Sequence, residues 1–175
     1  MRTTKTSALL LLAAACLAGG ATAGSNPTFD RFKALTGDWI AAEDSEHVKK
    51  GDLVASYRLT GGGSAVVEDI FPGTPHQMTT VYHMDGEALI ATHYCPQGNQ
   101  PRLDYHPELS GQRLEFRFRD ATNLENPAAA HQHAFWIEIA PDAAAFCRNE
   151  TYLENGEPGS ETTTFNRIPQ PTSNP

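Results

Sequence analysis

Two histidines, His131 and His133, open the segment "HQHAFWIEIA" and have the spacing best suited to chemistry in this chain. In an extended strand both would fall on the same face as Phe135, and that face should point into the protein. Two imidazoles on one strand face lie about 7 Å apart at the backbone, which is close enough to serve one metal ion. The pair therefore suggests a zinc site near the end of this strand.

A zinc site needs more than two protein ligands, so other side chains would have to join the pair. The sequence offers four candidates: His83, His93, Glu68 and Asp69. Haem held by one histidine is another alternative, although nothing singles out one of the seven histidines as its ligand. The interpretation that we favour needs no cofactor: polar side chains line the mouth of a ligand cavity and bond to each other, to water or to ligand.

His83 and His93 flank the dipeptide Asp85-Gly86, which is typical of a two-residue hairpin turn. With those two residues as the loop, Met78 pairs with His93, and the two histidines point to opposite faces. His93 has the more apolar neighbours, so we expect His93 to be the one that enters the interior. A change of one residue in the loop would reverse this choice.

Cys95 follows His93 by two residues in "THYCPQGNQPRLD", so both share a strand face. A Cys–His nucleophile is one hypothesis, but no side chain that would orient the imidazole is evident. A disulfide between Cys95 and Cys147 is equally balanced against two buried thiols, and both are favoured over the nucleophile.

The residues after Cys95 form a turn with unusual hydrogen-bonding capacity. Asn99 and Gln100 bring two amide acceptors and four N–H donors to one place, between Gly98 and Pro101. Such a loop suits contact with a ligand at the mouth of a barrel. The alternative is that these residues only make the turn and start the next strand.

The elements that would position these residues are strands. In "LEFRFR", Leu114, Phe116 and Phe118 alternate with charged residues, as in a strand with one wet face. About nine or ten such short strands, separated by Gly- and Asn-containing turns, predict an antiparallel sandwich or a closed barrel. Before them, the spacing of apolar residues over 27–35 predicts one short N-terminal helix.

Three residues favour the closed barrel over the sandwich. Gly37 and Trp39 lie where the helix meets the first strand, and Arg167 lies near the end of the last strand. In an up-and-down barrel the first and last strands are neighbours, so Arg167 could lie across the Trp39 ring. Such a cation–π contact is worth about 0.5–2 kcal/mol.

Gly37-x-Trp39 with a late Arg167 resembles the opening and closing motifs of lipocalin-like (calycin) barrels. The segments "FKALTGDW", "GGGSAVVEDIFPGTPHQMTTVYHMDG", "THYCPQGNQPR", "DATNL" and "HQH" resemble more specifically a family of small exported bacterial proteins of uncharacterised function with that fold. The resemblance spans most of residues 29–168. It implies a fold and an export route, and it assigns no catalytic residues.

The first 23 residues predict a secretory signal peptide: a basic start, a short apolar run and small residues for cleavage after Ala23. Lipid anchoring through Cys16 is a less favoured alternative. The remaining chain has 11 basic and 21 acidic residues, so nucleic acid and anionic lipid would be repelled. We therefore expect an exported barrel domain over 24–168, a disordered tail over 169–175, and no membrane insertion after cleavage.

Together these features predict a barrel that binds a small, largely apolar molecule in its interior. We expect the apolar contacts from Tyr82, Phe116, Phe118, Phe135 and Ile137, and the orienting polar groups from His93, Asn99, Gln100, His131 and His133. The alternative function is a metal-binding, haem-binding or enzymatic barrel that uses His93, His131 and His133.

Overall fold

A computed structural model describes residues 26–168 of the chain. The predicted signal peptide (residues 1–23) and the predicted disordered tail (169–175) lie outside these residues. No helix among residues 26–168 is long and apolar enough to cross a membrane.

Ten strands and two short helices make up the described chain. The helices are α1 (Pro27–Lys33) and α2 (Pro107–Ser110), with a single 3-10 turn at Gly61–Gly63. The strands are β1 (Gly37–Ala41), β2 (Leu53–Thr60), β3 (Ala65–Ile70), β4 (Met78–Asp85), β5 (Ala88–Tyr94), β6 (Gln100–Tyr105), β7 (Leu114–Thr122), β8 (His131–Ile139), β9 (Ala145–Glu154) and β10 (Glu157–Arg167).

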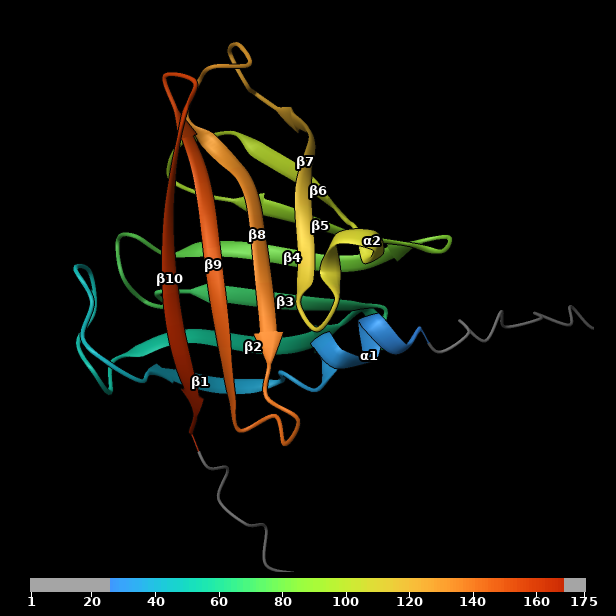
Figure 1. Ribbon diagram of the computed structural model, residues 1–175, viewed down its shortest axis with the longest axis vertical. Helices are drawn as coiled ribbons and strands as arrows, with labels where there is room; N and C mark the ends of the chain where they lie inside the picture. Colours follow the sequence, from blue (N-terminus) through green and yellow to red (C-terminus); the bar gives the residue numbers. More distant parts are fainter. Residues whose placement is uncertain (1–25, 169–175) are drawn as a thin grey trace, which may run out of the picture.

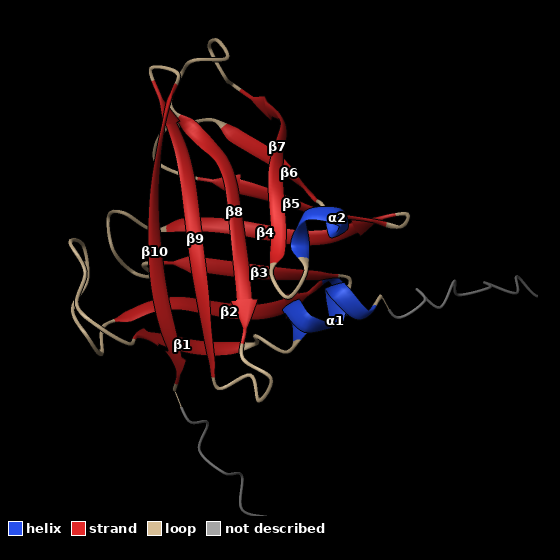
Figure 2. Ribbon diagram, in the orientation of Figure 1, coloured by secondary structure: helices blue, strands red, loops and turns tan. Residues whose placement is uncertain are grey.

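The ten strands form a closed antiparallel barrel in which each strand pairs with its neighbours in sequence, and β1 pairs with β10 (Figures 1 and 2). Closure gives both edge strands a partner, so no open edge remains in the sheet. The predicted all-β, up-and-down barrel is therefore confirmed, and it is compatible with a lipocalin-like fold.

Trp39 and Arg167 meet where the barrel closes, as their positions in the sequence predict. They are paired residues of β1 and β10, and the guanidinium carbon lies 4.2 Å from the centre of the indole ring. Arg167 also donates to three backbone carbonyls near this junction, those of Ala34, Thr36 and Ala143. One side chain thus ties the segment after α1 to the closing strands.

The predicted N-terminal helix is α1, and it lies at one end of the barrel (Figure 1). The Asn26 side chain accepts hydrogen bonds from the first free N–H groups, and Pro27 begins the helix. Phe29 and Phe32 are buried, and the Phe32 ring stacks on Tyr82 with 4.3 Å between ring centres. This end of the barrel is therefore filled by aromatic side chains. The four-residue helix α2 was not predicted from the sequence.

The β4–β5 hairpin differs from the prediction in register. Asp85 pairs with Ala88, so the two loop residues are Gly86 and Glu87 rather than Asp85-Gly86, and His93 pairs with Thr80 instead of Met78. The shift is two residues, and strand faces alternate with a period of two. The predicted register of the hairpin was therefore wrong, but the predicted face of His93 was right. His93 is fully buried, as expected.

Candidate functional site

The barrel has a cavity of about 320 Å³ at its open end. This end lies opposite α1 (Figure 1). The loops after β1, β3 and β5 rim the cavity, and β9 and β10 form one wall. The apolar lining residues include Val48, Val54, Ile70, Phe71, Met78 and Phe165. The volume is at the lower end of the range of about 300–1,000 Å³ that is usual for ligand pockets, so it suits a small molecule.

Phe71 at the rim of this cavity has an unusual backbone. Its φ is 51°, in the left-handed region that favours glycine. Its N–H donates to the carbonyl of Val54 at 2.7 Å, and its own carbonyl accepts from Thr74. A bulky residue held in this conformation costs of order 1–3 kcal/mol, a strain that is commonest at functional sites.

Strand β9 provides the polar part of the cavity. Arg148, Glu150 and Tyr152 alternate along it with the same parity as Phe146, which is buried in the core. All three polar side chains line the cavity. Since residues two apart in a strand share a face, the strand that starts in the apolar core continues as a polar floor.

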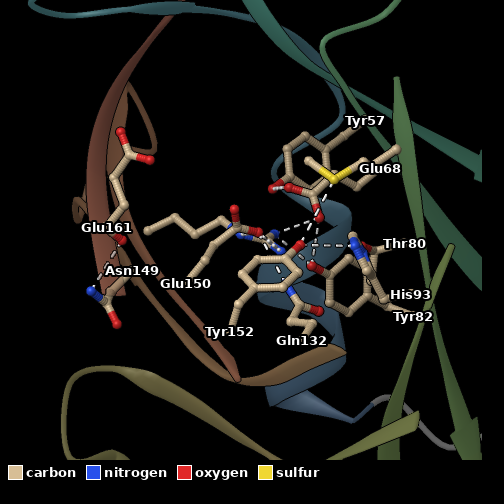
Figure 3. A network of polar contacts seen from close by, with 12 residues as sticks. Tyr57, Glu68, Thr80, Tyr82, His93, Gln132, Asn149, Glu150, Tyr152 and Glu161 are labelled. Carbon is tan, nitrogen blue, oxygen red and sulfur yellow. Dashed lines mark hydrogen bonds and ion pairs between the residues drawn. The ribbon is translucent and has the colours of Figure 1, made fainter. Parts of the chain in front are cut away.

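A buried cluster below this floor joins four strands (Figure 3). The Glu68 carboxylate of β3 accepts hydrogen bonds from the Tyr57 hydroxyl of β2 and, at 2.7 Å, from the Tyr82 hydroxyl of β4. Arg148 of β9 adds an ion pair, with 2.5 Å between Nη1 and Oε2 of Glu68. Three donors thus satisfy one carboxylate that is 1% exposed.

Burial and charge shift the pKa values within this cluster. Burial alone disfavours the charged form of Arg148, but the carboxylate of Glu68 holds the pKa of the guanidinium well above its ordinary value. Burial, reinforced by Glu68, raises the pKa of the Tyr57 hydroxyl well above its usual range. For Tyr82, burial is again the largest cause of a raised pKa. Arg148 therefore stays charged, and both tyrosines stay neutral donors.

Glu150 is a second carboxylate on the other side of the same guanidinium. Its Oε1 accepts from Arg148 Nε at 3.0 Å and from Gln132 Nε2 at 3.1 Å. The side chain is 23% exposed, more than that of Glu68. Burial is the largest cause of its raised pKa, and Arg148 opposes it. Glu150 is therefore the carboxylate of this cluster that the cavity reaches.

His93 lies behind the cavity wall and not in it. Its ring nitrogens bond to the Thr80 hydroxyl at 2.9 Å and to the Tyr152 hydroxyl at 3.1 Å. Burial, with a contribution from Arg148, lowers the pKa of the imidazole to about 3, so His93 is neutral. It can therefore orient Tyr152, which lines the cavity.

The structure brings the side chains of His131 and His133 together, but β8 does not alternate regularly at this point as predicted. Nδ1 of His133 lies 3.4 Å from Nε2 of His131, and both rings pack against Phe118. A bulge between Gln132 and Ala134 breaks the simple alternation that the sequence suggested. As a result Gln132, and neither histidine, bonds to Glu150 at the polar floor.

The metal hypothesis required further ligands beside these two histidines. Among residues 26–168, no group of three or more His, Cys, Asp or Glu side chains could hold a metal ion. Nor does any hydrogen bond or ring contact within that range join His93 to His131 or His133. The carboxylate of Glu68 is instead occupied by two tyrosines and an arginine.

The amides of Asn99 and Gln100 are used by the protein itself. Asn99 is buried, and its Nδ2 donates to the carbonyl of Ala130 at 2.8 Å. The Gln100 side chain bonds to Gly98, Thr122 and Asn123. These contacts fasten the β5–β6 turn to its neighbours, and neither residue lines the 320 Å³ cavity.

Three of the four aromatic residues expected as apolar walls form the packed core instead, whereas Phe118 packs against His131 and His133. Phe116 and Phe135 stack with 4.5 Å between ring centres, and Tyr82 contacts both rings edge-on. None of the three lines the cavity. Their part in ligand binding stays a prediction, and in the structure they fill the interior between α1 and the polar cluster.

Of the two alternatives for the cysteines, the structure has free thiols and no disulfide: Cys95 and Cys147 are both free and partly buried. Cys95 lies just past β5 and lines the cavity, whereas Cys147 contacts the Thr164 hydroxyl at 3.3 Å. Cys147 has the opposite parity to Arg148 and so lies on the outer face of β9. The two thiols are therefore on different sides of the barrel wall.

Arg148, Glu150 and Tyr152 were missed as site residues, although the sequence holds a signal for them. In "AAFCRNETYL" all three share parity with Phe146, and a charged pair on an inward face is unusual enough to indicate function. Tyr57 and Glu68 occupy such inward positions too, and they pair directly across β2 and β3.

A scan against protein-family models and a search of curated proteins each gave no match for this chain.

Proposed function

We propose that the protein binds a small, largely apolar molecule in the cavity at the open end of the barrel. The observation that carries the proposal is the cavity itself: about 320 Å³, with apolar walls and a polar floor of Arg148, Glu150 and Tyr152. Apolar walls favour transfer of the body of a ligand out of water, and a few fixed polar groups select its orientation.

The rigidity of the surroundings supports this proposal. Glu68 below the floor and Arg148 in the floor are held by hydrogen bonds across several strands, and at the rim Phe71 is fixed in a strained conformation. Groups that are already ordered lose little entropy when a ligand binds. The cavity is therefore preformed, as is usual for small-molecule sites.

Cavity-filling variants test the proposal. Thr163 lines the cavity, whereas Thr162, the next residue of β10, is exposed and bonds to Asn149. We expect Thr163→Trp to abolish binding of toluene, measured by saturation-transfer NMR, and the matched control Thr162→Trp to retain it. Equal signals from both variants would place the toluene elsewhere and contradict the proposal.

We also propose that the protein acts after export, on the strength of the N-terminal sequence pattern. N-terminal sequencing of the protein recovered from outside the cytoplasm should begin at Gly24. A protein that retains Met1 and stays in the cytoplasm would contradict export.

A further inference from the structure

One nitrogen at the cavity floor has no directed hydrogen bond within the described chain. Arg148 Nε donates to Glu150, and Nη1 donates to Glu68 and Tyr82. Nη2 forms an ion pair with Glu150 Oε1 at 2.8 Å, but it is the one buried guanidinium nitrogen that makes no hydrogen bond of good geometry within the described residues. A buried donor in this condition has a free-energy cost, which a suitable acceptor would remove.

The residue that carries this donor lines the cavity, although Nη2 itself is covered, so a ligand acceptor would reach it from the cavity when the covering side chains move aside. Arg148 is 2% exposed, and it projects from β9 between Glu68 and Glu150. The walls around it are apolar. A hydrogen bond made there is shielded from water, and it is stronger than the same bond at a wet surface.

Carboxylates outnumber the single positive charge of Arg148, and this argues against an acidic ligand. Glu68 pairs with one side of the guanidinium and Glu150 with the other. Glu161 adds a third carboxylate to the lining of the cavity. A ligand carboxylate would therefore meet like charges without an unpaired cation to neutralise it, and burying it would be unfavourable.

An amine is also poorly matched to this floor. The carboxylates around the guanidinium would attract an ammonium group, but such a group has only donors and would leave Nη2 without an acceptor. Glu150 Oε1 already accepts from Arg148 and Gln132. A neutral carbonyl, by contrast, accepts a hydrogen bond and brings no charge.

We infer that the ligand is a neutral carbonyl compound, an ester, ketone or aldehyde with a short apolar chain, whose oxygen accepts from Arg148 Nη2. This inference rests on the proposed function, because it places the carbonyl in the same cavity. The apolar chain then lies among the side chains of Val54, Ile70 and Phe165.

The test compares four molecules of matched chain: methyl octanoate, octanoate, octylamine and octane. Their dissociation constants are measured by equilibrium dialysis against the full mature chain at neutral pH. The ester should bind most tightly, with the other three weaker by about tenfold or more, which corresponds to about 1.4 kcal/mol. Tighter binding of octanoate or octylamine, or equal binding of octane, overturns the inference but leaves the proposed function standing. Failure of all four to bind overturns both.

Two variants test which groups are responsible. Glu68→Gln/Arg148→Gln removes both buried charges together, and the advantage of methyl octanoate over octane should then disappear. Glu150 is partly exposed, and Glu150→Gln removes a carboxylate that would repel octanoate. The dissociation constants of octanoate and methyl octanoate should therefore differ less in this variant. The inference is overturned if the double variant still binds methyl octanoate more tightly than octane. It is also overturned if Glu150→Gln leaves the ratio of the octanoate and methyl octanoate dissociation constants unchanged. Melting curves followed by circular dichroism establish that each variant is folded.

Discussion

Glu68 of β3 and Arg148 of β9 form an ion pair inside the barrel, with 2.5 Å between Oε2 and Nη1. The two side chains are 1% and 2% exposed, and 80 residues of sequence separate them. The pair connects opposite parts of the barrel wall, and it also separates the aromatic core near α1 from the cavity at the open end. We therefore expect both the stability of the fold and the proposed ligand binding to depend on this contact.

Removal of one partner should destabilise the fold more than removal of both. Arg148→Met leaves Glu68 buried without its cation, and we expect the free energy of unfolding to fall by about 3–5 kcal/mol. In Glu68→Gln/Arg148→Met no lone charge remains, and the amide oxygen can still accept from Tyr57 or Tyr82. Urea denaturation of Arg148→Met, Glu68→Gln and the double variant measures the coupling energy between the two residues. Strictly additive losses in the free energy of unfolding would contradict this account.

Arg167 should matter more for stability than the other arginine that lies over a tryptophan. Arg167→Lys loses the contact with Trp39 and most of its bonds to three carbonyls, so we expect a loss of about 2 kcal/mol. Arg113 lies 3.9 Å from the centre of the Trp136 ring on the exposed surface. The control Arg113→Lys should cost less than about 0.5 kcal/mol. Equal shifts in urea midpoint for the two variants would show that barrel closure does not depend on Arg167.

His93 should make the protein sensitive to acid. Its pKa is about 3 in the folded state, against an ordinary value of 6.5, so the unfolded chain binds a proton that the folded chain excludes. The free energy of unfolding is therefore unaffected by protonation of His93 above about pH 6.5. It decreases as the pH falls toward about 3, by up to about 1.4 kcal/mol per pH unit. We expect His93→Gln to flatten the pH dependence of the unfolding free energy between about pH 6.5 and 4. Parallel curves for the variant and the wild type would contradict a buried neutral His93.

The mature protein should contain two free thiols. Cys95 and Cys147 lie on different sides of the barrel wall, so a disulfide would require the strands to move. Thiol titration of the denatured, unreduced protein should find two reactive groups per chain. A value near zero, restored by reduction, would mean that the cysteines are bonded.

The closed barrel could be predicted from the sequence because two kinds of signal agree. Alternation in segments such as Leu114 to Arg119 gives the strands, and Trp39 with Arg167 gives the closure. The face of His93 was also predictable, since a register error of two residues does not change which side a residue faces. These features depend on local pattern or on a single pair.

The site was harder to predict because it depends on departures from pattern. The bulge at His133 moves Gln132 into contact with Glu150, and no residue type in "HQHAF" indicates it. The cluster of Glu68, Tyr82 and Arg148 joins strands that are remote in sequence, so parity alone places each residue inward without showing that they meet. The histidine pair in the sequence also indicated β8, whereas Arg148 and Glu150 of β9 line the cavity.

The most direct test of the central claim, that the cavity at the open end is the ligand site, is an intermolecular NOE measurement. A complex with methyl octanoate should show NOEs from the chain to the methyl groups of Val54 and Ile70, which line the cavity. NOEs only to the outer face near Cys147 and Ala145, or none to Val54 and Ile70 in a saturated complex, would contradict the claim.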